Sequence, residues 1–225
     1  MSPDTVSVII PARGESESLR SLLEKLEGES GIEVIVTVPQ GDEISIAAAR
    51  GFKAVIVEGT PGRGNQLAAG AGIAKGGVFL FCHADTMLPE GWKELVKKTL
   101  AEDSVAGGAF KLRFDSPKFR FRFIAFFANL RGSLLNLVYG DQSFFMKRDV
   151  YFAVGGFKPL PLMEDVEFIR RLRHVGNIRI VAKPVVTSAR RYEKSGVIFG
   201  VTRNILMLVL YFAGVSPEKL VRWYR

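Results

Sequence analysis

Acidic side chains that could bind a metal ion or accept a proton lie at two places in the sequence. The first is Asp85, in the sequence His-Ala-Asp-Thr, which follows the apolar run 78–82 and so projects from the end of a predicted central strand. One such carboxylate is enough for Mg²⁺ or Mn²⁺ when substrate phosphates complete the ligand shell. The alternative is that Asp85 caps a helix that follows the turn at 86–89.

The second acidic group lies in residues 163–168, Met-Glu-Asp-Val-Glu-Phe, at the start of a predicted helix. Either Glu164 or Asp165 would serve as a general base if it lies within hydrogen-bond reach of an acceptor hydroxyl. The structural alternative is that these carboxylates only interact favourably with the positive end of the helix macrodipole.

An anion-binding segment is predicted at 61–66, where two glycines and Arg63 precede a helix. Exposed backbone N–H groups and a guanidinium at the mouth of a helix suit a phosphate. The segment lacks both the Walker ending and the dinucleotide-binding glycine spacing, which argues against kinases, GTPases and NAD enzymes. A plain helix start that packs closely on a sheet is the alternative.

The elements that position these residues alternate along the first half of the chain. Apolar runs predict strands at 6–10, 32–38, 54–57 and 78–82, and helical patterns separate or follow them at 19–26, 44–50, 62–75 and 92–101. This alternation predicts a parallel sheet, and ligands of such sheets bind beyond the carboxyl ends of the strands. The loops 11–15, 61–64 and 83–86 occupy such positions.

The second half has a mixed pattern. Phe110, Leu112 and Phe114 alternate with polar residues, which predicts an antiparallel or half-exposed strand. A further strand is predicted at 143–146, and helices are predicted at 165–174, 197–215 and from Pro217. No linker interrupts the chain, so we expect one domain over 1–225, with a nucleotide-binding half at 1–101 and an acceptor half with C-terminal helices at 102–225.

Composition and charge limit the class of protein. The 225 residues are 48% hydrophobic and 24% charged, as in an ordinary globular protein. The net charge of +8 calls for an anionic partner, but no nucleic-acid-binding signature accompanies it, so we expect no nucleic acid. A single cysteine, Cys82, and a first segment unlike a signal peptide predict a cytoplasmic protein.

Two apolar segments predict a contact surface. Aromatic residues alternate with basic ones in 118–131, and the segment 197–215 is as long as a membrane span but contains Arg203 and Asn204. We therefore expect an interfacial or core helix there, and a basic, apolar face, completed by residues 222–225, that meets the inner face of an anionic membrane or a second subunit. The alternative is that both segments pack on each other as core.

Several short motifs occur in order along nearly the whole chain. They are Ser7-Val8-Ile9-Ile10-Pro11 with Glu15, Gly62-Arg63-Gly64 with Gln66 and Gly70, Phe81 through Pro89, Gly140-Asp141-Gln142, Gly155-Gly156-Phe157, Glu164-Asp165 and Ser188-Ala189-Arg190-Arg191-Tyr192. Taken in this order, the motifs resemble the family 2 inverting glycosyltransferases, in particular a small bacterial branch with a His-Ala-Asp-Thr loop.

The resemblance implies an α/β fold of the GT-A type, a Rossmann-like, mainly parallel sheet flanked by helices with a mixed C-terminal half. It implies an enzyme that moves a sugar from a nucleotide-diphosphate donor to an acceptor, for which a lipid-linked molecule is one candidate. A UDP-sugar is favoured because it is the commonest donor in the family. The cofactor implied is a divalent cation, Mg²⁺ or Mn²⁺.

The resemblance also assigns residues to the site. Asp165 is the implied catalytic base, and Asp85 is the implied metal ligand, with His83 either joining the metal shell or bonding a phosphate. The nucleotide-binding residues implied are Pro11, Ala12, Arg13, Glu15, Arg63, Gln66, Ala84 and Asp85. The residues implied on the sugar and acceptor side are Asp141, Gln142, Gly156 and Glu164.

The sequence departs from the family pattern at three places. His83 replaces the first acid of the D-x-D motif, residues 38–41 replace the acid after the second strand, and Ala68 or Ala69 replaces a helical Asn. Two alternatives follow from other classes of protein. One is a sugar-1-phosphate nucleotidyltransferase, although its Gly-rich basic loop after the first strand is missing, and the other is a degenerate, non-catalytic binding module at a membrane surface.

Overall fold

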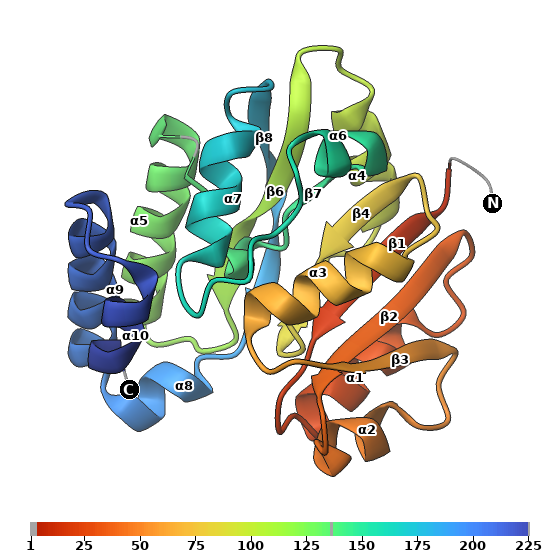
Figure 1. Ribbon diagram of the computed structural model, residues 1–225, viewed down its shortest axis with the longest axis horizontal. Coiled ribbons are helices and arrows are strands. Elements are labelled where there is room, and N and C mark those ends of the chain that lie inside the picture. Colours follow the sequence, from red (N-terminus) through yellow and green to blue (C-terminus); the bar gives the residue numbers. More distant parts are fainter. Residues whose placement is uncertain (1–3, 136, 225) are drawn as a thin grey trace.

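In the computed structural model, which describes residues 4–135 and 137–224, one mixed sheet runs through the centre of the molecule (Figure 1). Its eight strands have the order β3-β2-β1-β4-β7-β6-β8-β5. Their bounds are β1 Val6–Pro11, β2 Ile32–Pro39, β3 Ala54–Gly59, β4 Val78–Phe81, β5 Thr86–Met87, β6 Val105–Phe114, β7 Phe145–Lys147 and β8 Asn177–Thr187. The fold is the α/β fold that the sequence predicts.

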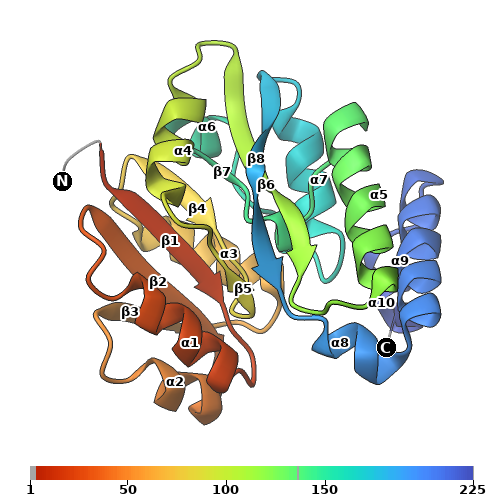
Figure 2. The same cartoon turned by 180° about the vertical axis from the view of Figure 1, so that it is seen from behind.

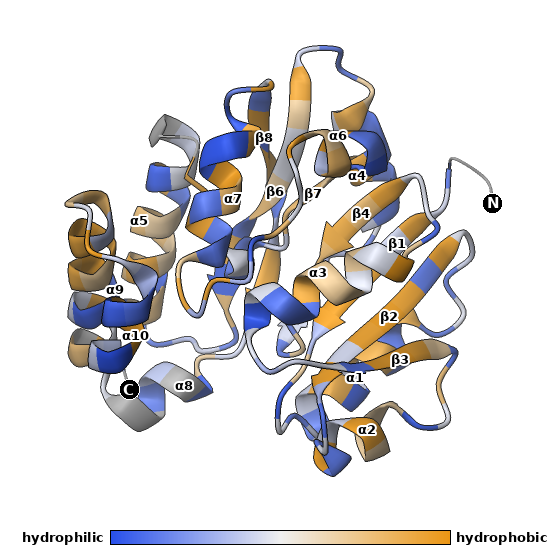
Figure 3. Cartoon of the chain, in the orientation of Figure 1, coloured by the Kyte–Doolittle hydropathy of each residue, from blue (hydrophilic) through white to orange (hydrophobic). Residues whose placement is uncertain are grey.

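The first half of the sheet is parallel. β1 lies between β2 and β4, and β3 extends the sheet at its edge, all with parallel pairing. Residues Val6–Ile10 of β1 are buried, as are the four residues of β4, because helices cover both faces of this part of the sheet. Figure 3 shows these strands mostly in the hydrophobic colour, with short hydrophilic interruptions.

Helices form a layer on each face of the sheet. One layer contains α1 Glu17–Leu26, α2 Glu43–Ala49 and α4 Trp92–Leu100, and Figure 2 shows these helices in front of the strands. The other layer contains α3 Arg63–Ile73, α6 Arg148–Ala153 and α7 Glu164–Leu172. Every second residue of β1 packs in one layer and Ile9 in the other, as expected for a strand buried on both faces.

The second half of the sheet is mixed, as the alternating pattern predicts. The short strand β7 joins the halves because it pairs antiparallel with both β4 and β6. β6 also pairs in parallel with β8, and β8 pairs with β5. Lys111 and Arg113 of β6 are exposed between buried neighbours, so the end of this strand is half-exposed.

The remaining helices extend from one end of the sheet (Figure 1). They are α5 Phe119–Leu135, α8 Arg190–Ser195, α9 Val197–Phe212 and α10 Pro217–Tyr224, and a 3₁₀ turn, η1, covers Gly140–Gln142. α5 packs on β6 through Phe121 and Ala125, whereas α9 packs on α10 and on the start of α7 through Met207. Much of the apolar surface of α5 and α9 is exposed, so the alternative that both segments pack on each other as ordinary core is wrong.

No helix among the described residues has both the length and the apolar character that crossing a bilayer requires. α9 contains 16 residues and ends at Phe212. The segment 197–215, which has the length of a membrane span, therefore includes a turn after the helix.

Candidate active site at the carboxyl edge of the sheet

The predicted site residues lie at the carboxyl edge of the parallel strands. The loops after β1, β3 and β4 all lie at this edge, because neighbouring parallel strands end on the same side. Gly62 begins α3 with φ of 125°, a conformation that other residues rarely adopt. This turn places Arg63 at the first position of α3, facing the start of α7.

The guanidinium of Arg63 is the centre of the site. Its Nε bonds the carboxylate of Glu164, and its Nη2 lies 3.2 Å from Oδ2 of Asp165. Its Nη1 lies 3.4 Å from Nε2 of His83. The burial of Arg63 opposes its charge, but Glu164 and Asp165 outweigh this effect and hold the pKa of Arg63 above its usual range. Arg63 therefore carries a positive charge between two buried carboxylates.

Two glycines allow these loops to approach so closely. A Cβ at Gly64 would lie 2.7 Å from the backbone oxygen of Lys158, and one at Gly140 would lie 2.7 Å from Nε2 of His83. A Cβ at Gly64 would push α3 away from the backbone at Lys158, whereas one at Gly140 would displace the His83 side chain from its place beside Arg63. The glycines quoted as motif residues therefore have a packing reason.

Asp165 is buried and held by backbone donors. Its Oδ2 accepts a hydrogen bond of 3.0 Å from the backbone N–H of Gly140, and its Oδ1 accepts one of 2.8 Å from Val166. Beside it, burial raises the pKa of Glu164, while Arg63 opposes this shift. The two carboxylates thus share Arg63, but Asp165 also accepts hydrogen bonds from the backbone N–H groups of Gly140 and Val166.

Two buried polar atoms near Asp165 have no hydrogen-bond partner in the described part of the chain. Among the described residues, Oδ1 of Asp141 and the hydroxyl of Tyr139 are buried without a hydrogen bond. Burial raises the pKa of Asp141 and raises that of Tyr139 to about 12. The guanidinium of Arg131 lies 3.5 Å from the centre of the Tyr139 ring. Unpaired buried polar groups are rare, so this side of the site has unused capacity for a polar ligand.

Asp85 lies in the short connection between β4 and β5. Burial and then the nearby carboxylate of Glu15 raise the pKa of Asp85. Arg190 lowers it in part, and its Nη2 lies 3.3 Å from Oε2 of Glu15. The alternative role of Asp85 as a helix cap is wrong, because the next helix, α4, begins at Trp92 with Gly91 as its N-cap.

The loop after β1 is held by polar contacts from its neighbours. Nε2 of Gln66, a buried residue, donates to the backbone oxygens of Ala12 and Thr37 at 2.8 and 2.7 Å. The backbone N–H of Gly14 donates to Oδ2 of Asp42, which also caps α2. No acid occurs within residues 38–41 at the end of β2, and the sequence pattern missed Asp42, which is the next residue.

The remaining predicted residues divide between surface and interior. Pro11 is half-buried, Arg13 is exposed and Ala84 is buried beside Asp85. Gln142 is buried, with Nε2 donating to the backbone oxygen of Phe110.

Gly156 is buried as well, and its oxygen accepts a hydrogen bond of 2.6 Å from Nη2 of Arg171. The structure thus brings Arg63, His83, Glu164 and Asp165 together. It gives Gln66, Gln142 and Gly156 contacts that support the surrounding loops.

Protein ligands for a metal ion are few at this edge. Within the part of the chain that the structure describes, no three His, Cys, Asp or Glu side chains converge on one point that could hold an ion. Asp85 and Glu15 repel each other, however, and a cation between Asp85 and a bound diphosphate would offset this repulsion. The donor set therefore fits a cation shared with substrate phosphates and does not form a cage of protein ligands alone.

A mixed sheet with helices on both faces and acidic loops at its carboxyl edge defines an α/β fold of the GT-A type. The chain belongs to glycosyl transferase family 2, whose model matches residues 7–160. No curated protein matches the sequence.

Two solved structures share the fold. Residues 1–349 of TarS from S. aureus align with a TM-score of 0.61 and 15% identity, over 82% of this chain and 60% of that one. The mannosyltransferase PcManGT from Pyrobaculum calidifontis, in complex with GDP-Man and Mn²⁺, aligns with a TM-score of 0.62 and 20% identity, over 81% of this chain and 56% of that one. The chain thus spans less than two thirds of the length of either.

Proposed function

We propose that this protein is an inverting glycosyltransferase that moves a sugar from a nucleotide-diphosphate donor, with UDP as the favoured nucleotide, to an acceptor hydroxyl. The observation that carries the proposal is the Arg63 cluster, in which a guanidinium, the His83 imidazole and the Asp165 carboxylate meet beside the carboxyl ends of β1 and β4. The family match favours sugar transfer over the nucleotidyltransferase alternative.

Asp165 acts as the general base in this proposal. Its carboxylate takes the proton of the acceptor hydroxyl while the oxygen attacks the anomeric carbon. The bond from that carbon to the diphosphate breaks on the opposite face, and the diphosphate leaves with the electron pair, so the configuration inverts. The hydrogen bond from Gly140 orients the carboxylate for this role.

Arg63 stabilises the departing diphosphate. In the structure it is ion-paired with Glu164 and Asp165, so a bound diphosphate would compete with these carboxylates for the same guanidinium. We infer that donor binding draws Arg63 toward the phosphates and leaves Asp165 free to accept a proton. The charge of Arg63 is then used where negative charge develops.

Each half of the chain binds one of the two substrates in this proposal. Residues 1–101 bind the nucleotide through the loops that contain Pro11, Ala12, Arg13 and Glu15, with Ala84 and Asp85 near the diphosphate. Gln66 positions the first of these loops through its contacts with Ala12 and Thr37. Residues 102–225 bind the sugar and the acceptor, with Asp141 and Glu164 at the cluster and Gln142 and Gly156 as loop supports.

A divalent cation fits the donor side. Asp85 would hold Mg²⁺ or Mn²⁺ together with the donor diphosphate, and the bound ion would supply Lewis-acid stabilisation of the leaving group. Nε2 of His83 faces Arg63, so His83 could bind the ion only after Arg63 moves. We therefore assign Asp85 as the protein ligand and His83 as a phosphate-bonding residue.

A thermal-shift screen of UDP, GDP, CDP and dTDP, with and without Mn²⁺, tests this proposal. A nucleotide at a hundred times its dissociation constant stabilises the folded chain by about 2.7 kcal/mol. We expect stabilisation by one nucleotide that increases with Mn²⁺, and loss of that increase in the Asp85→Ala variant. The Asp103→Ala variant, which changes an exposed acid in the turn before β6, is the matched control.

Slow hydrolysis of the corresponding nucleotide-sugar separates an enzyme from a binding module. We expect release of free sugar in the absence of acceptor. Nucleotide binding without any hydrolysis would support the non-catalytic module, and the absence of binding to all four nucleotides would contradict the proposed function.

A further inference from the structure

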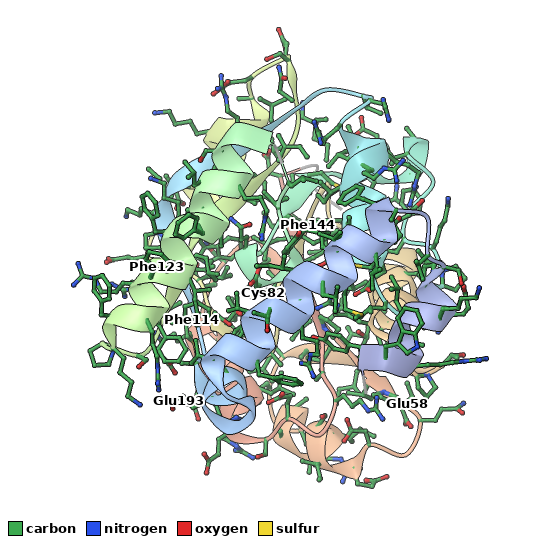
Figure 4. All side chains as sticks on the ribbon, turned by 90° about the vertical axis from the view of Figure 1, so that its left-hand side faces the viewer. Glu58, Cys82, Phe114, Phe123, Phe144 and Glu193 are labelled. Carbon is green, nitrogen blue, oxygen red and sulfur yellow. The ribbon has the colours of Figure 1, made fainter. Side chains whose placement is uncertain are left out.

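Two helices of the acceptor half expose large apolar side chains on the same side of the molecule (Figure 4). We name this surface the docking face and define it by Phe119, Phe123, Phe126 and Phe127 of α5 and Ile205 and Val209 of α9. Each of these side chains is at least half exposed. Monomeric proteins rarely expose so many large apolar residues together, and such patches commonly mark a contact with a protein or a membrane.

The fold does not need these side chains for its core. The opposite side of α5 buries Phe121 and Ala125 against β6, and the opposite side of α9 buries Met207 beside α10. Each exposed aromatic ring on the outer sides forgoes the stabilisation that burial of its apolar surface would supply. The outer sides therefore have the composition of an interface and not that of an ordinary solvated helix.

The charges on this face are basic. Neither α5 nor α9 contains an Asp or Glu residue, and the exposed Arg120 and Arg122 alternate with the aromatic residues of α5. Glu193 of α8 is paired with Lys118, which lies just before α5, at 2.6 Å. Aromatic rings with adjacent long cationic side chains suit the boundary between phosphate headgroups and hydrocarbon.

The docking face adjoins the acceptor side of the proposed site. Met207 of α9 packs with Met163 and Val166, which flank Glu164 and Asp165. Near the C-terminal end of α5, Arg131 stacks on the ring of Tyr139, which is the N-cap of η1. The two helices thus connect the exposed apolar surface directly with the elements that hold Asp165.

We propose that the docking face binds the surface of an anionic phospholipid bilayer without crossing it. Arg120 and Arg122 contact the lipid phosphates, and the phenylalanine rings enter the headgroup boundary. If the proposed function is right, this orientation presents an acceptor embedded in the bilayer to Asp165. Binding itself does not depend on that reaction.

Co-sedimentation with vesicles tests the docking face. We expect the wild-type chain to bind vesicles of phosphatidylcholine with phosphatidylglycerol at low salt, to bind less at high salt and to bind poorly to phosphatidylcholine alone. The variants Phe123→Ser/Phe126→Ser and Arg120→Glu/Arg122→Glu should each lower the partition coefficient on the order of tenfold or more. The first variant removes two apolar rings from the headgroup boundary. The second removes two basic residues, each of which contributes about 1 kcal/mol near an anionic surface.

Matched variants control for loss of apolar surface and of charge in general. Ile44→Ser/Val55→Ser removes two exposed apolar side chains from α2 and β3, and Lys97→Glu/Lys98→Glu reverses two charges on α4. Both controls should bind vesicles as the wild type does. Equal losses in the control and face variants would overturn the proposal, because binding would then follow net charge or general hydrophobicity.

A measured solution mass completes the test. A dimer that the Phe123→Ser/Phe126→Ser variant dissociates, with no binding to either vesicle, would show that a second copy of the chain covers the face, and the proposal would be wrong. Donor hydrolysis measured without vesicles should be the same in the wild type and the face variants. A wild-type chain that binds vesicles but does not hydrolyse the donor would contradict the proposed function. It would leave the proposal for the docking face unaffected.

Discussion

Arg63 is the residue on which both halves of the proposed site depend. It belongs to residues 1–101, the proposed nucleotide half, yet its guanidinium is paired with Glu164 and Asp165 of the proposed acceptor half. A charged group shared between two carboxylates and the position of a diphosphate can respond to donor binding without a large movement of the backbone. In the proposed function, the ion pair with Arg63 would hold Asp165, the proposed base, until a donor diphosphate competes for the guanidinium.

Removal of the proposed base gives the most direct test at this scale. We expect Asp165→Asn to lower donor hydrolysis and transfer by roughly 10²–10⁴-fold, the usual contribution of a general base. The dissociation constant of the nucleotide, measured by titration calorimetry, should change little because the base acts on the acceptor. A variant that retains turnover would remove Asp165 from this role.

Two neighbouring glutamates should have opposite effects on the pH dependence of stability. Burial raises the pKa of Glu164 above its ordinary value of 4.5, so its contribution is present below pH 4.5 and is lost as the pH rises through the raised value. Burial also acts on Glu167, but hydrogen bonds from Arg171 and Lys158 outweigh it and lower the pKa. The contribution of Glu167 is therefore present above pH 4.5 and is lost as the pH falls.

Urea denaturation at a series of pH values checks these signs. In Glu164→Gln the free energy of unfolding should fall less steeply with pH above 4.5 than in the wild type. In Glu167→Gln it should fall less steeply on acidification below 4.5. A Glu164→Gln variant that follows the wild-type pH dependence throughout would show that Glu164 titrates as an ordinary exposed carboxyl group.

The sequence indicated single residues of the site better than their partners. Asp85 and Asp165 stand out because each lies at a clear element boundary, and the structure places Asp85 after β4 and Asp165 at the start of α7, as predicted. The contacts of Arg63 with the start of α7 join residues about a hundred positions apart, for which no local pattern exists. Arg131 and Tyr139 were also missed, because their contact joins α5 to the residue before η1 and follows no helical or strand spacing.

At the scale of elements, the packing of α3 on β1 and β2 determines where Arg63 lies relative to the edge of the sheet. Gly70 faces β1 and β2, and a Cβ there would lie 2.6 Å from Cγ2 of Ile9 and 3.0 Å from Cγ2 of Thr37. The small residues of α3 thus allow the helix to lie directly on the strands. This contact sets the height of Arg63 above the sheet edge.

Two glycine substitutions in α3 should shift stability in opposite directions. Gly70→Ala should lower the free energy of unfolding by about 1–3 kcal/mol through overpacking. Gly72→Ala, on the exposed side of the same helix with nothing within 4 Å of the added Cβ, should raise it by about 0.4–1 kcal/mol. Urea denaturation of both variants measures the difference. Equal shifts would mean that α3 does not rest on the strands at Gly70.

Regular elements of the first half were predictable because each has a strong local signal. The strands β1 to β4 are apolar runs, and α1 presents Leu19, Leu22, Leu23 and Leu26 at helical spacing. β8 was missed because its residues alternate irregularly, Pro184 interrupts it and a register shift occurs between Phe110 and Lys111 of its partner. β5, with two residues, and α6, with six, are too short to give a pattern.

At the scale of the whole molecule, the two halves share one sheet and one core. β7 of the second half completes the pairing of β4, and the rings of Phe81 and Phe144 are 5.1 Å apart. The rings of Phe79 and Tyr151, which also belong to different halves, are 5.4 Å apart. Separation of the halves would expose these aromatic side chains and an unpaired strand edge, both of which are unfavourable in water.

The chain should therefore unfold as one cooperative unit. In Trp223→Phe the buried Trp92 of α4 is the only tryptophan, so its fluorescence reports on the first half while far-ultraviolet circular dichroism reports on all helices and strands. We expect the two signals to change at the same urea concentration, because the shared core couples the halves. A fragment of residues 1–101 should show no cooperative transition, since it lacks β7 and the aromatic partners of β4. Two separate midpoints in the full chain, or a fragment that unfolds cooperatively, would show that the nucleotide half is a domain in its own right.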